Sequence, residues 1–146
     1  MRISSAFWDA SAIIPLCVFQ DATKAARQTR RKFSACAIWW GTTVEINSSL
    51  ARLKRTGLLE NIAFNAASNK LTDFQRPARI IKPSDTMLDI AGELPERFGL
   101  RSLDAFQLAS ALIWCRERPR NRPFVSADSR LGEAARDAGF EVVLLL

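Results

Sequence analysis

Short segments of β-forming residues alternate with longer segments of helical periodicity along the whole chain. The apolar run Ala35–Trp40, for example, is followed by Thr42–Arg55, where isoleucine and leucine recur at helical spacing. Successive parallel strands need a crossover, usually a helix, so this alternation favours a parallel sheet covered by helices on both faces. We therefore predict an α/β fold with a parallel sheet of about five strands. The length of 146 residues suggests a single domain over residues 1–146.

The expected elements follow from where each pattern starts and stops. Strands are predicted at Ile3–Trp8, Ala35–Trp40, Arg79–Lys82, Pro123–Ser126 and Glu141–Leu146. Helices are predicted at Ser11 to about Arg31, Thr42–Arg55, Leu58 to about Phe74, Ser84–Phe98, Ser102–Arg116 and Ser129–Ala138. The apolar character of the last strand predicts that it is buried on both faces.

Cysteine usage and hydropathy restrict the compartment. The three cysteines are widely spaced, and the chain has no histidine, so no Cys/His zinc site is possible. We expect them to be small core residues in a reducing environment rather than a disulfide scaffold. No run of 18 apolar residues is present, and Ala12–Phe19 is too short to span a membrane. These features predict a cytoplasmic protein with no membrane association.

The charge is strongly basic. The formal net charge is +6, and 16 of the 21 basic residues are arginine. An excess of positive charge favours a polyanionic partner, and the guanidinium group offers a planar fork of donors to phosphate. Solubility alone is the alternative explanation for the charge.

Acidic residues fall where a parallel sheet would gather them. Asp9 follows the first predicted strand, Glu45 lies in the first helical turn after the second, and Asp128 closes the fourth. Ligands of such folds bind outside the carboxyl ends of the strands. Asp104 differs, because no strand precedes it and it lies in the first turn of its own helix.

Each acid also has a purely structural explanation. Glu45 would complete a capping box with Thr42, and Asp128 would cap the helix that follows it. Asp104 would be favoured by the helix macrodipole. Asp9 is the hardest to explain in this way, because the neighbouring Ser11 is itself an adequate cap.

Four carboxylates at one sheet edge would nevertheless repel each other, and Mg²⁺ or Mn²⁺ would relieve that repulsion. Carboxylates with such a cation on a basic protein indicate phosphodiester hydrolysis.

At these residues the sequence resembles the PIN domain, and in particular the VapC-type toxins of bacterial toxin–antitoxin pairs. Four segments in order carry the resemblance over nearly the whole chain. They are Phe7–Ala12, Thr42–Ile46 continuing to Ala51–Leu53, Leu103–Ala109, and Phe124–Asp128 followed by Arg130–Leu131 and Ala134–Ala135 before Gly139.

The resemblance implies a five-stranded parallel sheet, often a homodimer, and Mg²⁺- or Mn²⁺-dependent RNA cleavage that an antitoxin protein neutralises. By position it implies catalytic roles for Asp9, Glu45, Asp104 and Asp128, with Asp9, Asp104 and Asp128 as metal ligands. Ser11 and Ser126 match the hydroxyl positions of the family, which would support the acids; Ser126 stands where many members have threonine.

The segment Arg116–Pro123 looks longer than usual for the family and is rich in arginine and proline. Arg116, Arg118, Arg120 and Arg122 are therefore candidate RNA contacts, and a solvated loop is the alternative.

Other classes with the same element order fit less well. A response-regulator receiver needs an acidic pair after the first strand, and a haloacid-dehalogenase-like phosphatase needs Asp-x-Asp, but Asp9 is followed by Ala10 and Ser11. No glycine-rich phosphate loop is present. The remaining alternative is a catalytically inactive PIN-like module that binds RNA or another protein.

Overall fold

A computed structural model describes residues 4–146. Its centre is a five-stranded sheet of strand order β3-β2-β1-β4-β5, in which all neighbouring strands are parallel. The strands are β1 (Ser5–Trp8), β2 (Ala35–Trp39), β3 (Arg79–Ile81), β4 (Pro123–Ser126) and β5 (Glu141–Leu144). The helices are α1 (Ala10–Cys17), α2 (Thr23–Lys32), α3 (Thr42–Arg55), α4 (Asn61–Gln75), α5 (Asp85–Phe98), α6 (Ser102–Trp114) and α7 (Ser129–Asp137). The predicted α/β class and five-stranded parallel sheet are confirmed.

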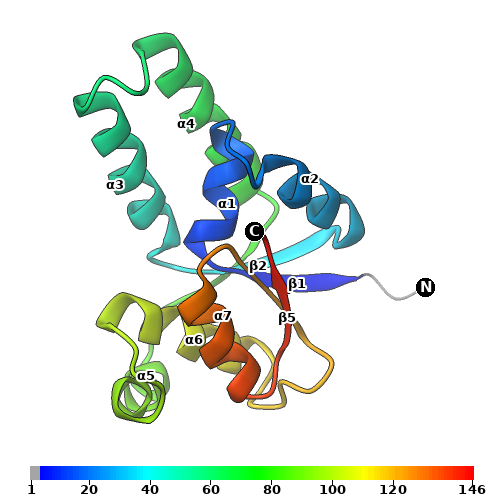
Figure 1. The fold of residues 1–146 in the computed structure, drawn as a ribbon. Coiled ribbons are helices and arrows are strands. Elements are labelled where there is room, and N and C mark those ends of the chain that lie inside the picture. The colour runs from blue at the N-terminus through cyan, green and yellow to red at the C-terminus, as the bar shows by residue number, and fades with distance from the viewer. Residues whose placement is uncertain (1–3) are drawn as a thin grey trace.

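Helices cover both faces of the sheet, α1–α4 on one side and α5–α7 on the other (Figure 1). Side chains of a strand alternate between the two faces, so each central strand supplies two cores. Phe7 and Phe124 belong to the core beneath α5, α6 and α7, whereas Trp8 and Val125 belong to the core beneath α1–α4. All four side chains are fully buried, which explains why the central strands are apolar without interruption.

The single helix predicted from Ser11 to about Arg31 is wrong, because the structure has two helices, α1 and α2, with a break between them. The break is stabilised by Thr23, which is buried. Its hydroxyl donates to the Pro15 carbonyl at 2.7 Å and accepts from the Gln20 amide at 2.8 Å. A carbonyl at the end of α1 and an amide before α2 are thus satisfied without continuing the helix.

The prediction that the last strand is buried on both faces is also wrong. Strand β5 lies at the edge of the sheet and, within residues 4–146, pairs with β4 alone. Glu141 is exposed and the rest of the strand is half-buried. Val142 packs against one core and Val143 against the other, so both sides of the strand require apolar residues even though neither is fully covered.

Other boundaries agree within a few residues, apart from Ile3 of the first predicted strand, which lies outside the described residues. Two shortened helices have local causes. Helix α4 begins at Asn61 rather than Leu58, because Gly57 takes a positive φ of 76° and starts a turn. Helix α6 ends at Trp114, because Arg116 and Glu117 leave the helical region for positive φ.

All three cysteines are buried and free, as expected. No helix within residues 4–146 has both the length and the apolar character needed to cross a membrane.

Candidate active site

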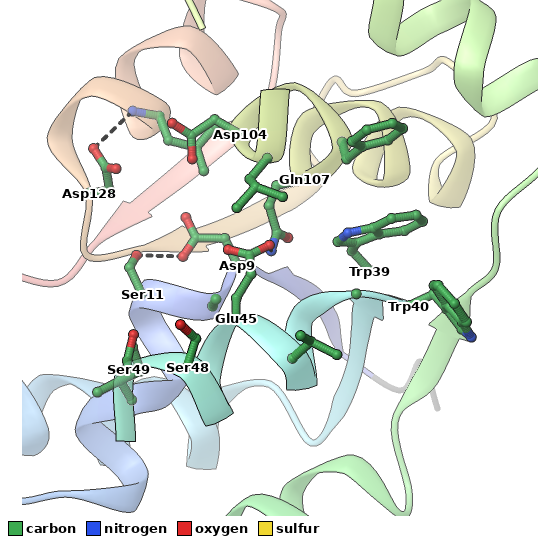
Figure 2. Close-up of a pocket in the computed structure, with 17 residues that line it drawn as sticks. Asp9, Ser11, Trp39, Trp40, Glu45, Ser48, Ser49, Asp104, Gln107 and Asp128 are labelled. Atoms are coloured by element: carbon green, nitrogen blue, oxygen red, sulfur yellow. Dashed lines mark hydrogen bonds between the residues drawn. The ribbon is translucent and has the colours of Figure 1, made fainter. Parts of the chain in front are cut away.

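The four predicted acids line one pocket of about 690 Å³ at the carboxyl edge of the sheet (Figure 2). Asp9 follows β1, Glu45 lies in the first turn of α3 just beyond β2, and Asp128 follows β4. Asp104 reaches the pocket by another route. Helix α5 ends at Phe98, Gly99 with its φ of 67° turns the chain, and α6 then begins at Ser102. The structure therefore brings together residues that lie up to 119 positions apart in the chain (from 9 to 128).

Asp9 is the most deeply placed acid, with 1% of its surface exposed. It is the N-cap of α1, a role that the sequence argument assigned to Ser11. Its Oδ1 accepts hydrogen bonds from Ser11 Oγ at 2.5 Å and from the Ala12 amide at 3.3 Å. Its Oδ2 is buried and has no hydrogen-bond partner. Burial raises the pKa of Asp9 to about 6, although hydrogen bonds from Ser11, Ser126 and Ala12 act in the opposite direction.

Ser11 and Ser126 join the exits of β1 and β4. Their hydroxyl oxygens lie 3.4 Å apart, and Ser11 Oγ also accepts from the Ala127 amide at 2.9 Å. Ser126 Oγ accepts from the Asp128 amide at 3.0 Å. Both serines therefore hold the backbone beside the acids, and Ser11 also holds the Asp9 carboxylate.

Glu45 is held by a residue that the sequence argument did not single out. Gln107 is 1% exposed, and its Nε2 donates to Glu45 Oε1 at 3.0 Å and to Thr42 Oγ1 at 2.9 Å. The proposed capping box does not form, because Gly41 is the N-cap and no side chain caps α3. Burial raises the pKa of Glu45 to about 7; the bond from Gln107 lowers it, and the charges of Asp9 and Asp104 raise it further. The available signal was a glutamine inside an apolar helical run, one turn beyond Asp104.

Asp104 and Asp128 form the outer part of the acidic set. Partial burial raises the pKa of Asp104, as does the charge of Asp128, while Arg101 and Arg130 lower it. Asp128 is the N-cap of α7, as its structural explanation predicted. Its Oδ1 accepts from the amides of Arg130 at 2.9 Å and Leu131 at 3.2 Å. Capping and lining the pocket are therefore compatible roles for this residue.

The acids fit a hydrated divalent cation better than a cage of protein ligands. Within residues 4–146, no three histidine, cysteine or acidic side chains lie close enough to form a three-ligand metal site. Direct contacts of Asp9, Asp104 and Asp128 with a metal stay a prediction. Mg²⁺, however, commonly keeps several waters and binds only one or two carboxylates. The buried Asp9 Oδ2 has no partner and belongs to the same pocket as Glu45, and two carboxylates so placed suit such a cation.

The arginine-rich loop lies away from this pocket. Arg116, Arg118, Arg120 and Arg122 precede β4, and because all strands are parallel, they lie at the opposite, amino edge of the sheet. Arg122 is held over the Trp114 ring, 4.2 Å from its centroid. Their contact with RNA stays a prediction, and it would require a strand long enough to pass from one edge to the other.

Comparison with solved structures finds the same architecture over almost the whole chain. A toxin–antitoxin complex from Klebsiella pneumoniae contains a chain that matches with a TM-score of 0.65 at 17% identity, covering 97% of this chain and 98% of that one. A protein from Pyrobaculum aerophilum matches with a TM-score of 0.67 at 20% identity, covering 97% and 90%. VapBC2 from Rickettsia felis, bound to a DNA fragment from its promoter, matches with a TM-score of 0.63 at 15% identity, covering 94% and 98%.

The chain has a PIN-like fold. No protein-family model matches the sequence, and no curated protein matches it. At these low identities, the likeness establishes the fold alone. The acids of this PIN-like domain therefore have to be judged on their own geometry, as described above.

Proposed function

We propose that the protein is an endoribonuclease that uses Mg²⁺ or Mn²⁺ to hydrolyse RNA phosphodiester bonds. The observation that carries this proposal is the gathering of four carboxylates in one pocket around the buried, unpartnered Asp9 Oδ2. The net charge of +6 supports a polyanionic substrate, since the rest of the surface must offset the negative pocket.

The residues have distinct tasks in this proposal. Asp9 and Glu45 would hold the cation, with Asp104 and Asp128 near its water shell. A bound divalent cation supplies Lewis-acid stabilisation of the phosphate and lowers the pKa of a bound water. Ser11 orients the Asp9 carboxylate through its 2.5 Å hydrogen bond, and Gln107 orients Glu45. The buried position of Asp9 and Gln107 keeps both contacts away from competing water.

The proposal is tested by incubating purified protein with single-stranded and looped RNA in Mg²⁺, Mn²⁺ or EDTA. We expect cleavage with either metal and none in EDTA, with activity returning when excess metal is added. RNA left intact in both metals would reject the enzyme and favour the alternative, a catalytically inactive PIN-like RNA-binding or protein-interaction module. The absence of a three-ligand cluster within residues 4–146 is the observation that keeps this alternative open.

We further propose that the protein is the toxin of a toxin–antitoxin pair, acting in the cytoplasm as a homodimer and neutralised by a small VapB-like antitoxin. The support is the likeness to chains of a toxin–antitoxin complex and of VapBC2, which extends over at least 94% of this chain. Expression of the protein alone is expected to stop bacterial growth, and co-expression of the partner to restore it. Normal growth with abundant folded protein would reject the toxin role and leave the nuclease chemistry untouched.

A further inference from the structure

The end of the pocket away from the acids is built from aromatic rings. Trp39 at the end of β2 lies flat against Phe106 of α6, with ring centroids 5.3 Å apart and planes within 5°. Trp40 meets the edge of Trp39 at 6.1 Å. Figure 2 shows the labelled residues in sequence from the acids through Gln107 to Trp39 and then Trp40. The same pocket therefore has a charged end and an apolar end.

The outer rim of this aromatic end faces solvent. Trp40 is 57% exposed, and the apolar side chains Val44 and Leu103, which line the same pocket, are 70% and 56% exposed. Trp39, by contrast, is 8% exposed and forms the inner wall. Apolar side chains that are exposed together around one pocket mark a place where a ligand is bound.

Gly41, the residue just before α3, leaves room for the Trp39 side chain. A Cβ atom on Gly41 would lie 2.6 Å from Trp39 Nε1, so any larger residue would displace the indole. Figure 2 shows that nitrogen on the side of the ring nearer to Glu45 and Asp9. Trp39 therefore offers a hydrogen-bond donor toward the charged end while its face remains packed on Phe106.

We propose that this aromatic end binds one unstacked nucleobase of single-stranded RNA, stacked on Trp40, while the adjoining phosphate lies toward the acids. The inference rests on the proposed nuclease function. A nucleotide has a flat apolar base and a charged phosphate at opposite ends, as this pocket has an aromatic and an acidic end. Bases of a duplex are stacked on one another and cannot enter, whereas single-stranded bases stack readily on aromatic side chains.

The test measures binding in protein that carries Asp9→Asn, which slows cleavage, with excess Mg²⁺ present so that the cation offsets the remaining acids beside the RNA phosphate. The probes are a short fluorescein-labelled single-stranded RNA of mixed sequence and an abasic ribose-phosphate strand of the same length. Trp40→Leu, which keeps an apolar side chain but removes the ring, is expected to weaken RNA binding about 5- to 150-fold. Trp40→Phe should retain most of the affinity. Phe19→Leu is the matched control, because Phe19 is an aromatic residue, 84% exposed, that does not line the pocket.

Binding of the abasic strand should not depend on Trp40. Unchanged RNA affinity in Trp40→Leu would overturn the inference and leave the exposed rim as a surface for a protein partner. An equal loss for both probes, or no RNA binding by any variant, would overturn it as well. The proposed function is judged separately, by cleavage with wild-type protein. If the wild-type protein cleaves RNA but binding does not depend on Trp40, only the base site is rejected. If binding depends on Trp40 but no cleavage occurs, only the enzyme is rejected.

Discussion

Replacing Asp9 with asparagine is expected to reduce metal-dependent RNA cleavage by more than about 100-fold while leaving the protein folded. Removal of a residue that merely supports a metal ligand commonly lowers activity 10- to 100-fold, so loss of a ligand itself should exceed that range. Asparagine is also an effective N-cap, so helix α1 should still begin at this position. The measurement is the initial rate of cleavage in Mg²⁺, with circular dichroism to verify the fold.

Asp73→Asn is the matched control, because Asp73 is an exposed acid on α4 outside the pocket. It should cleave RNA at the wild-type rate. Full activity in folded Asp9→Asn protein would show that Asp9 takes no part in the reaction. The proposed nuclease would then lose the central observation that supports it.

In metal-free buffer, the free energy of unfolding is expected to fall as pH rises from about 4 to about 7. The folded-state pKa values of Asp9 and Glu45 are about 6 and about 7, above their ordinary values of 3.8 and 4.5. Between these limits the folded protein binds more protons than the unfolded chain, so stability decreases with pH. The shift of Asp9 alone corresponds to about 3 kcal/mol, fully lost above its folded-state pKa.

The comparison with Asp9→Asn isolates this contribution from that of all other groups. The variant should melt several degrees higher than wild type in EDTA at pH 7.5 and equally at pH 3.5. Added Mg²⁺ should stabilise wild type by about 2.7 kcal/mol at 100 times its dissociation constant, and the variant by less. A wild-type melting temperature that changes neither with pH nor with added Mg²⁺ would contradict a charged pocket that binds metal.

Most of the acidic set is predictable from sequence because it follows from local order. Asp9 and Asp128 follow strands closely, Glu45 lies in the first turn of the helix after β2, and parallel strands end at one edge. The same reasoning places Arg116 through Arg122 at the other edge, since they precede β4. Asp104 has no strand before it, and only the resemblance of its helix to the PIN domain indicated a role.

Features that depend on distant contacts were not predictable. The position of Gln107 in an apolar helical run was a signal, but its role depends on its bond to Glu45, 62 positions away. The stacking of Trp39 on Phe106 likewise depends on how α6 crosses the sheet. Strand order does not follow from alternation alone, so the edge position of β5 was missed. The break before α2 depends on the contact of Thr23 with Pro15 across eight positions.

Each of the four acids lies at the start of a helix: Asp9 and Asp128 as N-caps, Glu45 and Asp104 in first turns. Each helix start carries a partial charge of about +0.5, so together they oppose the four carboxylates with about +2. One divalent cation would then bring the pocket close to electrical neutrality. In the proposed nuclease, a pocket without the cation would repel an RNA phosphate, and a pocket that holds the cation would repel it far less. The helix starts would thereby reduce the charge that a bound cation has to offset before RNA can approach the acids.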